Sequence, residues 1–243
     1  MATATRLAVV TGTSRGLGLA VAEALLARGW QVLGVARGEA PLAAAGYRHH
    51  RLDLADLPAL QAFVAGPLAA AAGAPGVVRL GLVNNAARLG PVGPLHRAGA
   101  AALAQALTLN AVAPLRLLGA LVEAAETRPL RAVNVSSGAA RKAYAGWGAY
   151  CAGKAALRLA SEVAGLEAGG HDLAVVSYEP GVVDTAMQAE VRAAATEDFP
   201  MVARFRELHA GGRLVDPRAP AAEVAALLER DDLAPWSERR HGG

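Results

Sequence analysis

The sequence predicts an α/β fold in which a doubly wound parallel sheet carries helices on both faces. Short apolar segments alternate with longer segments of helical periodicity along the chain, which is the pattern of βαβ units. A glycine-rich turn joins the first apolar segment to the first helical one, as in Rossmann-like sheets. No repeat, linker or change of composition divides the 243 residues. We therefore expect residues 1–243 to form a single Rossmann-like domain.

The first half of the predicted sheet follows from short apolar runs and the helical stretches between them. Residues 7–10 form an apolar strand that leads into the glycine turn, and a helical pattern continues from there to about residue 28. Residues 31–36 are a second apolar run, and a third strand ends at about residue 52. Residues 57–72 then have the length and spacing of a helix.

The second half repeats the alternation. A fourth strand is predicted at 80–83, a helix at 100–126 and a buried strand at 132–135. A further helix at 149–168 precedes the sixth strand at 173–178. Strands that alternate in this way with helices favour a parallel order in the sheet.

The last part of the chain is predicted to be mixed. Residues 184–216 are less regular, and their position after the carboxyl end of a strand predicts a substrate lid. They carry four large apolar side chains: Met187, Phe199, Met201 and Phe205. A helix is expected at 220–230, and no strand is expected in the tail 233–243.

Composition excludes several classes of function. Hydrophobic residues make up 53% and aromatic residues 4%, which favours helices packed on a sheet over a β-sandwich. The net charge is +3, but the arginines are scattered rather than gathered in a basic stripe, so we expect no nucleic-acid partner. Cys151 is the single cysteine, and His49 and His50 have no neighbouring ligand set, so neither a disulfide nor a metal site is expected.

Location in the cell is predicted from the same composition. Gly, Pro and charged residues interrupt every apolar run before it reaches the roughly 20 residues that a membrane span needs. The first six residues lack the apolar region of a signal peptide. We expect a cytoplasmic protein without a membrane partner.

The glycine turn predicts a site for a dinucleotide. Its spacing is Gly12-x3-Gly16-x-Gly18, between a strand and a helix, where backbone N–H groups and the helix dipole attract a pyrophosphate. Ordinary turn chemistry is the alternative for such a motif taken alone. The residues expected to contact the cofactor here are Gly12, Ser14, Arg15, Gly16, Leu17 and Gly18.

Cations rather than an acid follow the second strand. NAD-binding domains usually place a carboxylate there for the ribose hydroxyls, whereas this chain has Arg37. Arg15 and Arg37 could together bind a 2′-phosphate, so NADP(H) is the expected cofactor; two solvated surface arginines are the alternative. Asp53 and Leu54 after the third strand are expected at the adenine. Asn84 and Ala86 after the fourth strand are expected beside the ribose.

Three residues predict the chemistry. Tyr150 and Lys154 stand at i and i+4, so on a helix they share one face. Ser137 follows a buried strand, where the carboxyl edge of the sheet can bring it to the same place. A hydroxyl, a phenol and an ammonium that converge can polarise a carbonyl and give it a proton. The ammonium is expected to lower the pKa of the phenol.

With these motifs the chain resembles the short-chain dehydrogenase/reductase family over nearly its whole length. The matching pieces appear in family order and near family spacing: Thr11 to Gly18, Asn84-Asn85-Ala86, Asn110, Ser137, Tyr150-x3-Lys154 and Pro180-Gly181. Ala87 departs from the glycine usual in the family.

The resemblance assigns roles to individual residues. It implies that Asn110, Ser137, Tyr150 and Lys154 are catalytic, with Asn110 holding a water for proton relay. It also implies further cofactor contacts at Tyr150, Lys154, Val183, Thr185 and Met187. Substrate contacts are implied at Ser137, Gly138, Trp147, Tyr150 and Gly181, although loop packing is an alternative role for Trp147.

Within that family the chain is similar to the sepiapterin reductases and their bacterial benzil reductase-like relatives. The similarity rests on residues 146–156, 180–188 and 212–216. It implies NADPH-dependent reduction of a ketone or 1,2-dicarbonyl, by a homodimer or homotetramer. The aspartate and closing strand that anchor a pterin have no match in the tail. A non-catalytic NADP(H)-sensing protein that binds a partner is the alternative.

Overall fold

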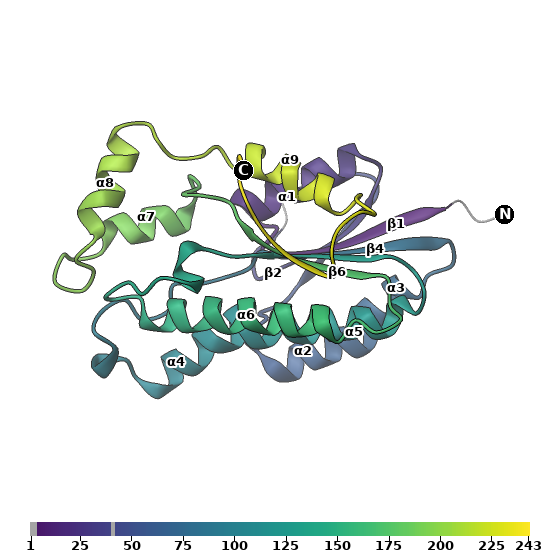
Figure 1. The fold of residues 1–243 in the computed structure, drawn as a ribbon, viewed down its shortest axis with the longest axis horizontal. Coiled ribbons are helices and arrows are strands. Elements are labelled where there is room, and N and C mark those ends of the chain that lie inside the picture. The colour runs from purple at the N-terminus through teal and green to yellow at the C-terminus, as the bar shows by residue number, and fades with distance from the viewer. Residues whose placement is uncertain (1–3, 40–41) are drawn as a thin grey trace.

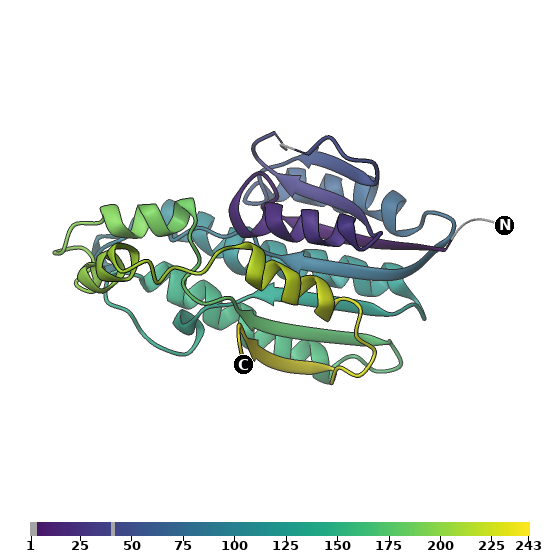
Figure 2. The same ribbon diagram turned by 90° about the horizontal axis from the view of Figure 1, so that it is seen from above.

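The computed structural model describes residues 4–39 and 42–243, so the first three residues of the segment screened for a signal peptide lie outside it. Among the described residues, seven parallel strands form one sheet in the order β3-β2-β1-β4-β5-β6-β7 (Figures 1 and 2). The strands are β1 Thr5–Thr11, β2 Gln31–Ala36, β3 Tyr47–Arg51, β4 Val77–Asn84, β5 Leu130–Val135, β6 Leu173–Glu179 and β7 Trp236–Arg240. The predicted fold class is confirmed.

Helices cover both faces of the sheet. In Figure 1, α1 and α9 lie on one face, and α2, α3, α4, α5 and α6 lie on the other. The α-helices are α1 Gly16–Ala27, α2 Leu57–Phe63, α3 Ala69–Ala72, α4 Ala100–Leu107, α5 Ala113–Ala125, α6 Gly148–Leu166, α7 Ala186–Ala193, α8 Val202–Ala210 and α9 Arg218–Leu227. Short 3-10 turns lie at Leu95–Arg97 and Gly138–Ala140.

The core has two layers because successive strand residues point to opposite faces. In β1, Leu7 and Val9 belong to the apolar cluster under α2, α3 and α5, whereas Ala8 and Val10 belong to the cluster under α1 and α9. All six residues of β5 are buried. Burial on both faces explains why the central strands are continuous apolar runs in the sequence.

Two helices predicted as continuous contain π-helical segments. Residues 57–72 divide at η1, Val64–Leu68, where Pro67 lies inside the helix. Residues 100–125 divide at η3, Thr108–Val112, which contains Asn110. π-Helical turns often mark functional positions, and apolar spacing cannot reveal a local change of pitch.

The tail corrects one expectation. Trp236–Arg240 forms β7, which pairs in parallel with β6, so the closing strand exists. Sequence periodicity missed it because its five residues, WSERR, are mostly polar. An edge strand has one neighbour, and charged side chains are common there.

The segment 184–216 is more regular than predicted, since it holds α7 and α8. Its two ends meet: Asp184 N donates to Val215 O at 2.9 Å, and Val215 N donates to Val182 O at 2.9 Å. In Figure 1 both helices lie beyond one end of the sheet, opposite the chain's N-terminus.

One helical stretch of the described residues, Ala100–Ala125, is long and apolar enough to cross a membrane by length and composition, with a mean hydropathy of 1.3. Leu117 and Leu121 from this stretch are fully buried against the sheet, as in a core helix of a globular fold. It is weak evidence for a membrane span.

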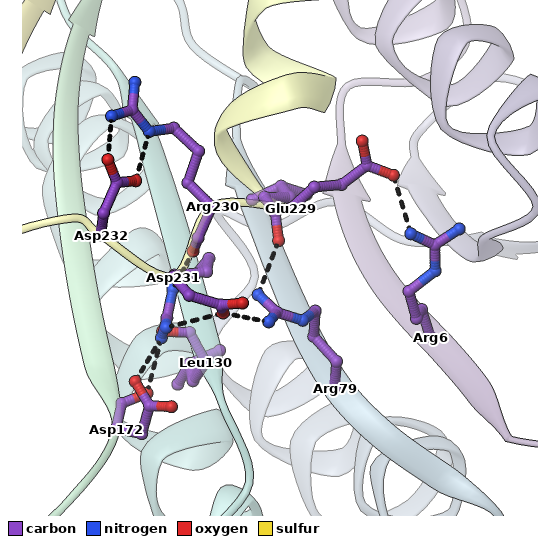
Figure 3. Close-up of polar contacts among 10 residues, drawn as sticks. Arg6, Arg79, Leu130, Asp172, Glu229, Arg230, Asp231 and Asp232 are labelled. Atoms are coloured by element: carbon purple, nitrogen blue, oxygen red, sulfur yellow. Dashed lines mark hydrogen bonds and ion pairs between the residues drawn. The ribbon is translucent and has the colours of Figure 1, made fainter.

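At the amino-terminal end of the sheet, arginines are paired with acids (Figure 3). Arg131 of β5 is 3% exposed, and its guanidinium donates to Asp172 Oδ1 at 2.7 Å and to Arg230 O at 2.7 Å. Asp231 bonds to both Arg79 and Arg131. These contacts fix the segment between α9 and β7 under the sheet.

Candidate active site

Two adjoining cavities lie at the carboxyl-terminal edge of the sheet. The first, called here the glycine-loop cavity, has a volume of about 440 Å³ and is lined by the loop after β1 and by the ends of β2 to β5. The second, the aromatic cavity, also has about 440 Å³ and lies between the end of β5, the start of α6, α7 and α8. Both linings share Ser137, Tyr150, Pro180, Gly181, Val183, Thr185 and Met187.

The glycine loop is built by close backbone approaches. Gly12 and Gly16 have φ of +76° and +59°, which side-chain-bearing residues rarely adopt. A Cβ on Gly18 would lie 2.3 Å from Gly12 O and 2.4 Å from Asn85 Nδ2. Gly18 is not in the lining; it lets α1 start directly against the loop. Thr11 Oγ1 accepts from the backbone N–H of Asn85 and Ala86, which holds the loops after β1 and β4 together.

The start of α1 can bind an anion. Its cap residue, Arg15, makes no side-chain cap, and the first turn contains no acidic residue. The first N–H groups of a helix lack intrahelical partners and carry the positive end of the helix dipole. This is a cradle that fits a pyrophosphate.

Arg15 and Arg37 both line the glycine-loop cavity. Arg15 is exposed and has no ion pair or side-chain hydrogen bond within the described residues. The Arg37 side chain is 70% exposed and lies 3.9 Å from Asp53 Oδ2, a loose contact. Asp53 and Leu54 are also in the lining, as expected. Two cations with weak or no acidic partners fit a phosphate better than the hydroxyls of an unmodified ribose.

Ser137, Tyr150 and Lys154 converge as predicted. Ser137 lies two residues after the end of β5 and caps the turn Gly138–Ala140, with its hydroxyl accepting from Ala139 N at 3.2 Å. Tyr150 and Lys154 lie one turn apart on α6, both buried. Lys154 Nζ donates to Val135 O at 2.6 Å and lies 5.8 Å from the centre of the Tyr150 ring. The sheet end and the helix thus hold the three side chains in one place.

The pKa values of the pair differ from the expectation. Burial raises the pKa of the Tyr150 phenol to about 12, although a hydrogen bond with Ser137 lowers it. Burial also lowers the pKa of Lys154 to about 8. Desolvation is the main influence on the Tyr150 pKa, and the influence that lowers it comes from Ser137 and not from Lys154 as expected. Near neutral pH the phenol keeps its proton and can donate it.

Asn84 and Asn110 are not brought to either cavity. Asn84 Nδ2 donates to Pro114 O at 3.3 Å and Asn134 Oδ1 at 2.8 Å, so this side chain joins β4, β5 and α5 instead of facing a ribose. Asn110 is 1% exposed, and its amide bonds to both N and O of Arg88. Its side chain therefore fixes the loop at Arg88. The neighbour Asn85 lies in the lining in place of Asn84.

The other predicted residues lie where expected. A Cβ on Gly16 would come within 3.2 Å of Thr185 Cγ2, so the 183–187 segment crosses close to the glycine loop. The residues predicted to contact the cofactor that line the glycine-loop cavity are Gly12, Ser14, Arg15, Gly16, Leu17, Arg37, Asp53, Leu54, Ala86, Tyr150, Lys154, Val183, Thr185 and Met187. The residues predicted to contact the substrate, Ser137, Gly138, Trp147, Tyr150 and Gly181, line the aromatic cavity.

Trp147 is the centre of an aromatic cluster in that second cavity. Its ring stacks on Phe199 with centroids 4.4 Å apart and meets the edge of Tyr150 at 5.6 Å. Tyr144 and Phe205 also contact it and line the cavity. The cluster gives the cavity a flat apolar wall.

Sequence reasoning missed much of this lining because its residues come from separate segments. The missed side chains include Arg141, Lys142, Tyr144, Arg204 and Arg240. One glycine, Gly146, marks the close approach of the loop before α6 to the segment before α8. Its φ is +85°, and a Cβ there would lie 2.1 Å from Asp198 O.

Comparison with known proteins agrees with this geometry. The family model described as short chain dehydrogenase matches residues 6–196. A benzil reductase ((S)-benzoin forming) from Bacillus cereus is 32% identical over 94% of this chain and 96% of that protein. Sepiapterin reductase from Mus musculus is 35% identical over 92% of this chain and 91% of its own length.

A solved structure supports the same assignment. A short-chain dehydrogenase/reductase from Burkholderia vietnamiensis superposes with a TM-score of 0.70 at 38% identity, covering 81% of this chain and 94% of that one. With the glycine loop, the Ser137–Tyr150–Lys154 cluster and these matches in agreement, the chain belongs to the short-chain dehydrogenase family of oxidoreductases.

Proposed function

We propose that the protein is an NADPH-dependent reductase of a ketone or 1,2-dicarbonyl. The observation that carries the proposal is that Ser137 and Tyr150 belong to the linings of both cavities. A proton donor thus lies at the junction between the glycine-loop cavity and the aromatic one. The similarity to a benzil reductase and a sepiapterin reductase supports a carbonyl with a flat, conjugated frame.

The glycine-loop cavity would hold NADP(H). The start of α1 would bind the pyrophosphate, and Arg15 and Arg37 would bind the 2′-phosphate. Asp53 and Leu54 would border the adenine, while Ala86 and the 183–187 segment would border the ribose and nicotinamide. When bound, the cofactor supplies the hydride.

The protein's own residues then serve the oxygen of the substrate. Ser137 donates a hydrogen bond to the carbonyl oxygen and stabilises negative charge as it develops. Tyr150 gives that oxygen its proton, which its pKa of about 12 keeps available near neutrality. Lys154 holds its ammonium against Val135 O and orients the nicotinamide ribose. Asn110, whose amide bonds to Arg88, would position the loop at Arg88 beside the site, and its role in proton relay stays part of the proposal.

The proposal includes a lid and a cytoplasmic location. Residues 184–216 would cover the substrate, since Met187, Gln188 and Phe205 from this segment line the aromatic cavity. The single cysteine, Cys151, is free and suits a reducing compartment.

We further propose that the protein is a homodimer or homotetramer through α5 and α6. A groove between them is lined by Leu115, Leu118, Gly119 and Val122 of α5 and by Leu159 and Val163 of α6. Leu159 is 60% exposed and Leu166 is 83% exposed. Apolar patches of this kind mark interaction sites.

Light scattering should report a multiple of the 24.7 kDa chain, and Leu159→Glu should shift the mass toward that of one chain. An unshifted mass would rule out this face.

The test of the function is NADPH oxidation, followed at 340 nm, with benzil, sepiapterin and 1-phenyl-1,2-propanedione. We expect at least one of them to be reduced. The alternative is a non-catalytic protein that senses NADP(H). It would bind NADPH without oxidising it in the presence of any carbonyl of the panel, and that result would overturn the proposal.

A further inference from the structure

The aromatic cavity has an apolar wall but a cationic rim. The wall is the cluster of Tyr144, Trp147, Tyr150 and Phe205. Around it the lining contains four cationic side chains and a single carboxylate, Glu179. The cations are Arg141, Lys142, Arg204 and Arg240.

The carboxylate is already neutralised. Arg141 Nη2 bonds to Glu179 Oε1, and the Glu179 side chain is 13% exposed. Arg141 Nη1 also lies 3.3 Å from Glu238 Oε2, and Glu238 is bound in addition by Arg158 at 2.8 Å. Glu179 and Glu238 therefore both have arginine partners, and Arg158 of this set also lies 3.8 Å from Glu162.

Three cations of the rim lie outside that set. Lys142 Nζ lies 5.9 Å from the centre of the Tyr144 ring, and within the described residues it has no acidic partner. Arg204 on α8 and Arg240 on β7 have no ion pair or side-chain hydrogen bond with any described residue. The three come from separate segments of the chain, and the fold gathers them around one opening. A cavity lined by one sign of charge focuses its field on ligands of the opposite sign.

The closing strand brings Arg240 to this place. Arg240 pairs in register with Glu179 at the carboxyl end of the sheet. The preceding residue, Arg239, pairs with Tyr178 and does not line the aromatic cavity. Successive residues of a strand point to opposite faces, so one arginine of the pair faces the cavity side and the other does not.

We infer that the aromatic cavity selects an aryl ketone that carries a carboxylate, which Arg240 binds with help from Arg204. The aromatic frame packs on Trp147 and Phe205, the carbonyl lies at Ser137 and Tyr150, and the carboxylate reaches the rim. Arg is suited to this task because its fork of N–H groups matches a carboxylate. The inference rests on the proposed function and specifies further that the substrate carries a negatively charged carboxylate.

The test compares acids with their methyl esters, because each pair keeps the same aryl ketone and replaces the carboxylate by a neutral group that is larger by one methyl. Two pairs are needed to vary the reach: benzoylformate and methyl benzoylformate, then 4-oxo-4-phenylbutanoate and its methyl ester. The measured quantity is kcat/KM with saturating NADPH. We expect one acid of the two pairs to exceed its ester by roughly tenfold, the gain typical of a hydrogen bond between charged groups.

Arg240→Gln should remove most of that preference, and Arg204→Gln should remove a smaller part. Arg239→Gln is the matched control: it deletes the same charge one residue away and should keep the preference. Thermal melting of each variant checks that it is folded. Because NADPH is itself an anion, the ratio of acid to ester is used, so that any effect on the cofactor cancels.

Each outcome decides something. If neither member of either pair oxidises NADPH but a compound of the benzil, sepiapterin and 1-phenyl-1,2-propanedione panel does, the proposed function stands and the inference of a carboxylate is overturned. If none of these compounds oxidises NADPH, the proposed function itself fails. If each ester has a kcat/KM equal to or above that of its acid, the proposed function stands and the inference of a carboxylate is overturned. If Arg240→Gln raises the KM for NADPH and leaves the ratio intact, the rim serves the cofactor, and the inference is again overturned.

Discussion

The two ends of the parallel sheet use arginine differently. At the amino-terminal end, Arg131 is 3% exposed and bonds to two carboxylates and three backbone carbonyls. At the carboxyl-terminal end, Arg141 is paired with Glu179, but Arg15 and Arg240 have no acidic partner within the described residues, and Arg37 has one at 3.9 Å. Paired arginines tie segments of the chain together, whereas unpaired ones remain available to an external anion. The difference separates the residues that maintain the fold from those that bind.

The largest effect is expected at Tyr150, where the carboxyl-terminal end performs its chemistry. Tyr150→Phe removes the proton donor and keeps the ring against Trp147, so kcat should fall by roughly 10²- to 10⁴-fold, the usual contribution of a general acid. NADPH affinity, measured by fluorescence titration, should change little. Full activity in this variant would show that another group donates the proton.

At the opposite end, Arg131→Ala should reduce stability rather than binding. It leaves Asp172 and the carbonyl of Arg230 without their cation, while Asp231 keeps Arg79, and the free energy of unfolding should fall by about 2–3 kcal/mol. Urea unfolding measures this loss. Arg37→Ala, at the carboxyl-terminal end, should shift the same free energy by less than about 0.5 kcal/mol. Equal losses would abolish the distinction between the two ends.

A smaller effect tests the phosphate site. Arg37→Asp should raise the KM for NADPH by roughly tenfold to a hundredfold, since a hydrogen bond between charged groups contributes about 1.5–3 kcal/mol. The KM for NADH should change less, because NADH lacks the 2′-phosphate. Arg48→Asp, an exposed arginine of β3 outside the lining, is the control. Parallel changes in both cofactors would remove the support for NADP(H).

The smallest effect is one of pH. Because burial lowers the pKa of Lys154 to about 8, its ammonium is lost as the pH rises through that value, and kcat/KM should decline by up to roughly tenfold per pH unit above it. The decline in kcat/KM does not come from a loss of stability caused by the deprotonation of Lys154. Between about pH 8 and 10.5 the unfolded chain holds this proton more firmly, so the Lys154 contribution to stability rises with pH. A flat profile from pH 7 to 10 would show that the charge of Lys154 is not needed.

Much of the fold followed from the sequence, because a parallel sheet buried on both faces leaves continuous apolar runs. The range 31–36 was predicted with its observed bounds for this reason. Trp236–Arg240 was missed, since an edge strand needs few apolar residues. The π-helical turns escaped prediction because the apolar pattern of a helix continues through them.

The glycine-loop side of the site was more predictable than the aromatic side. Gly12 to Leu17 and the Tyr150–Lys154 pair are local motifs, and they line the cavities as expected. Arg204 and Arg240 share a cavity only because α8 and β7 converge after folding, which no local spacing records. Asn84 and Asn110 show the reverse: a matching motif did not reveal that their side chains were bonded inside the protein.

The two border strands have a consequence for self-association. β3 has the sequence YRHHR and β7 has WSERR, and each has a single neighbour among the described strands. The unpaired backbone groups of an edge strand can pair with the edge of a second sheet. Charged side chains along the strand oppose this edge-to-edge pairing and the aggregation that follows from it. Addition of one sheet to another is therefore disfavoured at both borders, so copies of this chain have to meet through their helices if they assemble at all.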